Sequence, residues 1–292
     1  MKFAAIDIGS NAVRLLLARV FEKDDGPFIK KESLVRMPLR LGDDAFLRKS
    51  IPEEKVKKLS NTMLAFKYLM EAYEPLDYLA CATSAMREAE NSDKIITEIA
   101  KFSGIKLEVI DGKREANIIF STHIEEQLKL DTAYLYIDVG GGSTELTLFH
   151  KNQPVEERSF NIGTIRLLNN LVTKKQWNEV KEWTKEQCLK FNDISAIGSG
   201  GNINKMFRLS GKKENSPISY KKLILISNSI RQFSFEERIY KLGLRPDRAD
   251  VILPASKIFT SVMRWGDIKQ IYVPQIGLAD GLVHILYNRY KS

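Results

Sequence analysis

The 292-residue sequence is poor in the residues that build disulfide frameworks and zinc sites, and it has no long apolar runs. It holds two cysteines, Cys81 and Cys188, and three histidines in no metal-ligand spacing. Two distant thiols are too few for a disulfide framework or a zinc cluster, so we expect both to be reduced and buried. No apolar run approaches the roughly 20 residues of a membrane helix, and no signal-peptide pattern opens the chain. We therefore expect a soluble, cytoplasmic protein without a membrane partner.

The charge balance favours anionic partners. The chain has 45 Lys and Arg against 37 Asp and Glu, a formal charge of +8, within an otherwise ordinary globular composition. A positive field raises the local concentration of polyanions, of which nucleic acids and phosphate chains are two kinds. Few aromatic residues are interleaved with the basic ones, which disfavours a base-stacking surface and hence nucleic acid. The basic residues cluster at Arg36, Arg40, Arg48 and Lys49, and again at Lys205, Arg208, Lys212, Lys213, Lys221 and Lys222.

An internal repeat is the most informative pattern. Residues 3–17 and 134–148 each read as an apolar strand ending in Asp, a short turn rich in Gly, Ser or Asn, and a second strand. Asp7 and Asp138 occupy the same place before the glycine of each turn. One hairpin of this kind is common, but two matching copies predict a duplicated domain.

Strands alternate with helices around both hairpins, which predicts an α/β architecture with mixed sheets. The expected helices cover residues 52–73, 92–102, 113–126, 173–190, 220–232, 235–242, 248–262 and 281–290. Further strands are expected at 76–82, 107–110, 156–160, 195–197 and 270–273. We place the first domain at 1–126 and the second at 127–292, and leave open whether the last helix packs back on the first domain.

The two turns carry groups suited to phosphate and to a hard cation. Ser10 and Asn11 offer donors in the first turn, and the glycines at 140–142 let the backbone approach an anion in the second. Asp138 and Glu145 bracket the second turn, so both carboxylates can converge on one ion. Mg²⁺ prefers one or two carboxylates together with waters and phosphate oxygens, so Mg²⁺ is the expected cofactor.

Three further loops follow strands and carry candidate residues. Arg87 can grip phosphate bidentately. Glu115 lies in the first turn of a helix, where glutamate is ordinary, but the expected position of that loop at the same sheet edge makes it a candidate base. Gly200, Gly201 and Asn202 form a strand-to-helix turn that could bind a nucleotide or another anion. Each of these loops also has an ordinary structural interpretation.

Seven stretches together resemble the exopolyphosphatase and guanosine pentaphosphate phosphohydrolase (Ppx/GppA) family of the actin-like superfamily. They are DIGSNAVRL (7–15), ATSAMREAEN (82–91), IDGKREA (110–116), IDVGGGSTEL (137–146), GTIRL (163–167), GSGGN (198–202) and GLRPDRADVILPA (243–255). The resemblance implies two duplicated actin-like, ribonuclease H-like domains with an interdomain cleft. It also implies a short, two-domain form without the helical C-terminal domains of longer members.

The resemblance implies a Mg²⁺-dependent hydrolase that releases terminal phosphate from inorganic polyphosphate or guanosine pentaphosphate. Glu115 matches the catalytic glutamate that orients or deprotonates the attacking water, and Asp138 and Glu145 match the metal-binding acids. The phosphate-gripping positions match Ser10, Asn11, Arg87, Gly141, Gly142 and Ser143. Ala12 departs from the family pattern, because many members have a second serine there.

Two other functions remain as alternatives on the same scaffold. One is an ATP-dependent kinase, and the other is a non-catalytic sensor of a phosphorylated nucleotide. Glu115 and the GGGSTE turn favour hydrolysis over a kinase, and retention of all three acidic residues disfavours a sensor. The sequence ranks neither polyphosphate against guanosine pentaphosphate nor a monomer against a homodimer.

Overall fold

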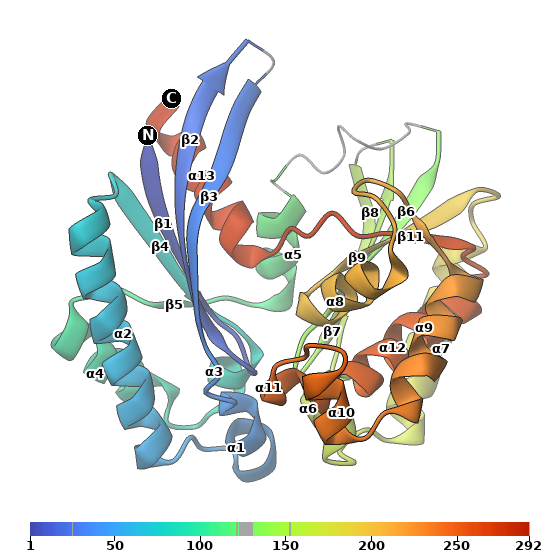
Figure 1. Ribbon diagram of the computed structural model, residues 1–292, viewed down its shortest axis with the longest axis horizontal. Helices are drawn as coiled ribbons and strands as arrows, with labels where there is room; N and C mark the ends of the chain where they lie inside the picture. The colour runs from blue at the N-terminus through green and yellow to red at the C-terminus, as the bar shows by residue number, and fades with distance from the viewer. Residues whose placement is uncertain (25, 121, 123–130, 152, 292) are drawn as a thin grey trace. The chain divides into compact units, whose positions relative to one another are not determined.

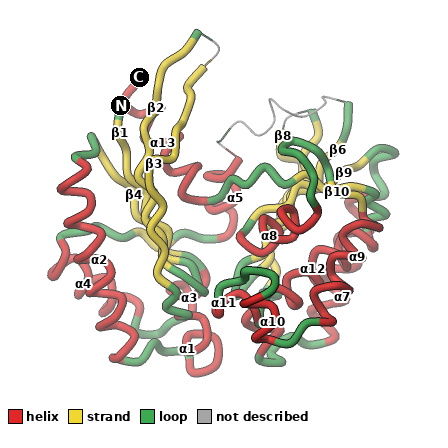
Figure 2. The backbone as a smooth tube through the Cα atoms, viewed as in Figure 1, coloured by secondary structure: helices red, strands yellow, loops and turns green. Residues whose placement is uncertain are grey.

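The computed structural model describes residues 1–24, 26–120, 122, 131–151 and 153–291. By its internal contacts the chain divides into two units, each built on one sheet (Figure 2). The first unit comprises Met1–Thr122 and Gly277–Ser292, and the second comprises His123–Ile276. The expected boundary at 126/127 lies outside the described residues.

The first unit has a five-stranded sheet in the order β3-β2-β1-β4-β5. Antiparallel pairing joins β1 to β2 and β2 to β3, whereas β1, β4 and β5 run parallel. The strands are β1 (Lys2–Ile8), β2 (Val13–Lys23), β3 (Gly26–Met37), β4 (Asp77–Ala82) and β5 (Glu108–Val109). Because β1, β4 and β5 are parallel, the loops after them emerge at one edge of the sheet, where α/β proteins bind ligands.

Helices cover both faces of the first sheet (Figure 1). In one layer α2 packs against α4, and in the other α13 packs against β1 and α5. The helices are α1 (Leu41–Arg48), α2 (Glu53–Tyr73), α3 (Ser84–Glu88), α4 (Ser92–Ser103), α5 (Gly112–Phe120) and α13 (Leu278–Lys291). The C-terminal helix therefore belongs with the N-terminal unit.

The second unit has a six-stranded sheet in the order β10-β11-β9-β6-β7-β8. Antiparallel pairing joins β6 to β7, β7 to β8 and β10 to β11, and parallel pairing joins β6 to β9 and β9 to β11. The strands are β6 (Ala133–Val139), β7 (Thr144–His150), β8 (Gln153–Phe160), β9 (Ile194–Ser199), β10 (Ile218–Ser219) and β11 (Gln270–Tyr272).

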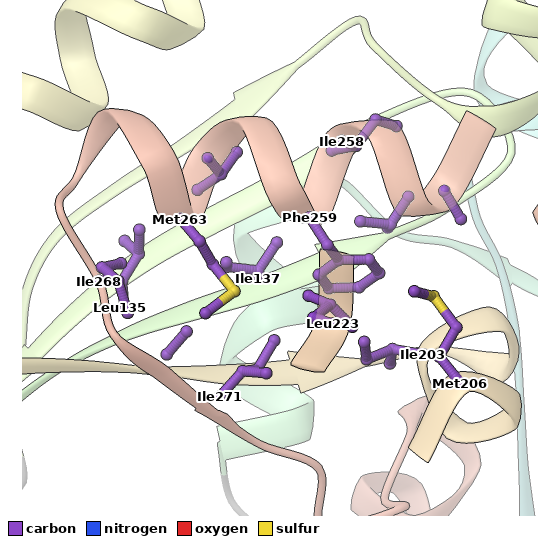
Figure 3. Close-up of a cluster of buried hydrophobic side chains, with 14 of the residues drawn as sticks. Leu135, Ile137, Ile203, Met206, Leu223, Ile258, Phe259, Met263, Ile268 and Ile271 are labelled. Atoms are coloured by element: carbon purple, nitrogen blue, oxygen red, sulfur yellow. The ribbon is translucent and has the colours of Figure 1, made fainter. Parts of the chain in front are cut away.

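One face of the second sheet carries the hydrophobic core of that unit (Figure 3). Phe259 and Met263 of α12 lie over Leu135 and Ile137 of β6 and Ile271 of β11, all fully buried. The helices are α6 (Thr164–Leu168), α7 (Lys174–Cys188), α8 (Gly201–Ser210), α9 (Tyr220–Gln232), α10 (Phe235–Tyr240), α11 (Pro246–Ala249) and α12 (Ile252–Trp265). Because side chains alternate along a strand, Tyr136 and Asp138 belong to the opposite face of β6.

The two sheets repeat one plan. Read in chain order, strands one to four of each unit take the same places and directions, with β1-β2-β3-β4 matching β6-β7-β8-β9. The irregularities also match. The pairing between the second and third strands shifts register at Leu17/Ala18 in β2 and at Leu148/Phe149 in β7. These shifts lie the same number of residues after Asp7 and Asp138. The predicted duplicated α/β fold is confirmed.

Most long elements match the sequence prediction, but the start of the expected helix at 248–262 is wrong. The structure instead ends α11 at Ala249 and starts α12 at Ile252. Pro254 gives the reason, since proline has no N–H and fits only the first turn of a helix. Restarting the helix at Ile252 places Pro254 in that turn. The edge strand β3 and the short helices α1, α3 and α6 were not predicted.

No helix within the described ranges is long and apolar enough to cross a membrane. Both cysteines are free and buried, as expected. Burial disfavours the charged thiolate and raises the pKa of Cys81 to about 12, with a smaller contribution from Glu108. Burial alone raises the pKa of Cys188 to about 12.

The packing of α13 depends on the absence of a side chain at Gly281. A Cβ at this position would lie 2.0 Å from the carbonyl oxygen of Ile118 in α5. Backbone atoms of a helix cannot yield cheaply to such a contact, so α13 and α5 would have to separate.

We therefore expect Gly281→Ala to destabilise the protein by roughly 1–3 kcal/mol, the usual cost of overpacking. Gly277→Ala is the matched control, because a Cβ there meets nothing within 4 Å. Urea unfolding of both variants measures the difference. The α13 packing described above would be contradicted if Gly281→Ala were as stable as the control.

The buried thiols give a second expectation. The thiolate is the reactive species, so at pH 8 iodoacetamide should label Cys81 and Cys188 at least ~100-fold more slowly in the folded protein than in urea. Thiols in the unfolded chain have a pKa near 9, whereas both folded values lie near 12. Titration of the two thiols therefore leaves the free energy of unfolding unchanged below about pH 9 and lowers it as the pH rises from about 9 to 12. Mass spectrometry of labelled peptides gives the rates, and rapid labelling of the native protein would overturn the assigned burial.

Candidate active site

The first turn, between β1 and β2, is held in place by its neighbours. Within the turn, the N–H of Gly9 donates to the carbonyl oxygen of Ala12 at 3.1 Å. The carbonyl oxygen of Ser10 accepts from the N–H of Gly42 at 2.9 Å. The hydroxyl of Ser10 lies 2.8 Å from that of Ser84, which follows the parallel neighbour β4. Both serines are buried, so the turn presents a fixed pair of hydroxyls.

The carboxylate that opens this turn already has a cationic partner. Asp7 and Arg14 are directly opposed in the β1–β2 register, and Arg14 Nη1 donates to Asp7 Oδ2. Directly opposed residues share a face of the sheet, which explains the contact. The hairpin therefore neutralises the charge of Asp7 internally.

The structure brings the predicted phosphate-gripping arginine next to the predicted catalytic glutamate. Arg87 lies in α3 after β4, and Glu115 lies in α5 after β5, the strand parallel to β4. Arg87 Nη1 donates to the carbonyl oxygen of Ile110 at 2.7 Å and lies 3.8 Å from Glu115 Oε2. The start of α5 is fixed by Asp111, whose Oδ1 accepts from the N–H of Arg114 at 2.7 Å.

The remaining donors of Arg87 are available for a ligand. Within the part of the chain that the structure describes, its Nε and Nη2 groups make no hydrogen bond. The side chain is partly exposed and anchored by Ile110. An anion bound by Arg87 would therefore lie beside the carboxylate of Glu115.

The second turn, between β6 and β7, has the same backbone as the first but different side chains. Gly140 N–H donates to the carbonyl oxygen of Ser143 at 3.0 Å, as Gly9 does to Ala12. Within the described residues, no hydrogen bond uses the N–H groups of Gly141 and Gly142. Backbone N–H groups of this kind bind anions.

Helix α6 holds the second turn from outside. The carbonyl of Gly141 accepts from Ile165 N–H at 2.9 Å, and the carbonyl of Gly142 accepts from Arg166 Nε at 2.7 Å. Arg166 is buried, and a Cβ at Gly163 would lie 2.3 Å from the carbonyl oxygen of Gly141. Because these contacts occupy the carbonyls of the turn, its geometry is set before any ligand arrives.

The two predicted metal-binding acids face each other. Asp138 and Glu145 are directly opposed in the β6–β7 register, the place that Asp7 and Arg14 hold in the first unit. Glu145 is only 4% exposed, and its Oε1 accepts from the hydroxyls of Ser143 at 2.6 Å and Ser159 at 3.0 Å. The single hydroxyl proton of Ser143 is thus committed to Glu145, which leaves its oxygen and backbone for other contacts.

This pair of acids suits a hard cation with few protein ligands. Two carboxylates from neighbouring strands match the donor set that Mg²⁺ takes when phosphate and water complete its coordination. No group of three or more His, Cys, Asp or Glu side chains in the described ranges is placed to hold a metal. A fully protein-ligated zinc or calcium site is therefore not formed by these residues.

The third turn, from β9 into α8, is positively charged. Gly200 has a φ of 104° and caps α8, and the Arg248 side chain packs so closely that a Cβ at Gly201 would lie 2.3 Å from its Nη2. The Asn202 Oδ1 atom is buried and makes no hydrogen bond within the described residues. Partial burial, with Arg208 and Arg248 nearby, lowers the pKa of Lys205.

Several residues of these clusters were not assigned a role from the sequence. Four of them lie within the stretches that carry the family resemblance, although those stretches do not show which groups they contact: Arg14, Ser84, Arg166 and Arg248. Ser159 lies in none of these stretches. Its contact with Glu145 follows only from the strand register.

Two curated proteins resemble this chain over most of its length. A "Bifunctional 3-dehydroquinate synthase/phosphatase" of Fusobacterium nucleatum is 29% identical over 89% of this chain, and the chain spans 43% of its length. A "Putative exopolyphosphatase" of Haemophilus influenzae is 23% identical and covers 99% of this chain and 93% of its own.

A crystal structure of an exopolyphosphatase from Cytophaga hutchinsonii has the same fold. It superimposes with a TM-score of 0.84 and covers 99% of this chain and 98% of its own, at 22% identity. The Ppx/GppA phosphatase family model matches residues 20–289, which include Arg87, Glu115, Asp138 and Glu145. The chain therefore belongs to the Ppx/GppA phosphatase family.

Proposed function

We propose that this protein is a Mg²⁺-dependent phosphoanhydride hydrolase that releases the terminal phosphate of inorganic polyphosphate, guanosine pentaphosphate or both. The observation that carries the proposal is the pairing of Arg87 with Glu115. A guanidinium suited to binding phosphate beside a carboxylate suited to orienting water supports this reaction. The family membership and the names of the relatives support the same reaction class.

Glu115 is assigned to the attacking water. Phosphoryl transfer passes through a loose transition state, so the protein has mainly to position the nucleophile and neutralise the phosphate oxygens. Orienting the water is therefore the larger part of this role, with proton acceptance as the smaller part. Arg87, anchored on Ile110, holds the phosphate through Nε and Nη2.

Asp138 and Glu145 are assigned to the cation. When bound there, Mg²⁺ supplies positive charge to the phosphate oxygens as they develop negative charge. The duplicated hairpin supports this assignment, because Asp7 is already neutralised by Arg14 whereas Asp138 faces a second acid. We therefore assign the cation to the second unit.

The two turns are assigned to phosphate binding. In the second turn, the N–H groups of Gly141 and Gly142 are free of internal hydrogen bonds in the described residues. In the first turn, the hydroxyl of Ser10 and the neighbouring Asn11 serve the same purpose. The cationic turn at 200–202 is the candidate contact for the part of the substrate beyond the terminal phosphate.

Replacing Glu115 and Arg87 separately should affect different kinetic constants. Glu115→Gln keeps the shape but removes the charge, so kcat should fall by about 10²–10⁴-fold with little change in KM. Arg87→Ala should raise KM, because its phosphate contact already exists before the transition state. Arg114→Ala is the matched control, since that side chain pairs with Glu108 at an exposed site. Steady-state phosphate release from polyphosphate and guanosine pentaphosphate measures all three, and near-normal kcat in Glu115→Gln would refute its role.

The metal assignment has its own test. Asp138→Asn should raise the Mg²⁺ concentration for half-maximal activity by at least about tenfold. Loss of an outer-shell hydrogen bond typically weakens metal affinity by about 10–100-fold, and loss of a direct ligand should weaken it at least as much. Asp267→Asn, which changes an exposed acid of the same unit, should leave that concentration unchanged. A titration of activity against Mg²⁺ gives the values. Full activity of the native protein in excess chelator would rule the assignment out.

A further inference from the structure

A row of four side chains crosses the second sheet at the level of the candidate cation site. Ser199 of β9 pairs with Asp138 of β6, Asp138 with Glu145 of β7, and Glu145 with Ser159 of β8. Residues directly opposed on neighbouring strands share a face of the sheet, so the four belong to one face. Ser159 is the member of this row on the outer strand, and nothing in the proposed reaction yet uses it.

Ser159 contacts the buried ligand Glu145 directly. Its hydroxyl donates to Glu145 Oε1 at 3.0 Å, and the hydroxyl of Ser143 donates to the same oxygen at 2.6 Å. The two donors come from different directions, one from the turn and one from the adjacent strand. A carboxylate oxygen that accepts two hydroxyls in this way has a fixed plane, which sets the direction in which the carboxylate can bind an ion.

The register shift in β7 is what places Ser159 there. Near the hairpin end, Phe149 pairs with Pro154 and His150 with Gln153. Continued without a shift, that register would set Arg158 opposite Glu145. The irregularity at Leu148/Phe149 moves the pairing by one residue, and a one-residue slip exchanges the faces of a strand.

The third strand of the first unit has the same register shift but a different residue at this position. There the third strand sets Arg36 beside Arg14, so the row that contains Asp7 also contains two arginines. An arginine opposite Glu145 would neutralise the carboxylate, as Arg14 neutralises Asp7. A serine instead donates a hydrogen bond and leaves the negative charge in place.

We propose that Ser159 is a positioning residue for the cation site: it orients the Glu145 carboxylate by donating a hydroxyl hydrogen bond to Oε1. This inference rests on the proposed assignment of Mg²⁺ to Asp138 and Glu145. It predicts an effect on cation affinity itself, before any substrate binds.

The test is calorimetric titration of the full-length protein with Mg²⁺ alone. Ser159→Ala should weaken Mg²⁺ binding by about 10–100-fold, the usual effect of losing an outer-shell hydrogen bond. Ser159→Thr keeps the hydroxyl and should restore affinity to within a few-fold of the native value. Gln153→Ala, an exposed change on the same strand, is the control and should bind like the native protein.

The outcomes separate the two proposals. Ser159 is exposed, so the melting temperature of the metal-free Ser159→Ala protein should match the control, which excludes a general loss of structure. If the native protein binds Mg²⁺ and Ser159→Ala binds it equally well, the role of Ser159 is wrong and the metal assignment stands. If the native protein shows no saturable Mg²⁺ binding, the metal assignment fails and the role of Ser159 fails with it.

Discussion

The register of the β6–β7 hairpin sets Asp138 directly opposite Glu145. Like charges at directly opposed strand positions repel, and burial of Glu145 makes its charge more costly still. Hydroxyls from Ser143 and Ser159 offset part of that cost. The proposed Mg²⁺ site rests on this pair of opposed acids.

Duplication explains how one backbone supports two chemistries. Both hairpins have the same turn hydrogen bond, the same strand directions and a register shift at the same place. What differs is the residue opposite the aspartate, which is Arg14 in one unit and Glu145 in the other. The first unit thereby opposes its aspartate with a cation, and the second opposes its aspartate with another acid.

The sequence alone predicted those parts of the site that depend on local spacing. Asp138 and Glu145 flank a tight turn, so their opposition follows from hairpin geometry. Arg87 and Glu115 follow strands that alternate with helices, so parallel pairing of β4 and β5 brings their loops to one edge. The candidate residues of each unit could be listed on this basis, and the fold class followed from the repeat.

Other features depend on contacts that spacing does not determine. Ser159 faces Glu145 only because of a one-residue register shift, which no local pattern reveals. Packing of the C-terminal helix on the first unit depends on a close approach of Gly281 to the Ile118 carbonyl. Helix α12 begins at Ile252 rather than at Arg248, because Pro254 fits only the first turn of a helix. Long-range packing and register, rather than propensity, account for these differences.

We propose above all that this chain hydrolyses a terminal phosphoanhydride. Release of inorganic phosphate by the purified protein, measured with Mg²⁺ on short and long polyphosphate, guanosine pentaphosphate, ATP and ADP, tests it most directly. We expect multiple turnovers of phosphate release from polyphosphate, guanosine pentaphosphate or both, at rates well above those with ATP and ADP. Absence of phosphate release from every member of this panel would contradict it.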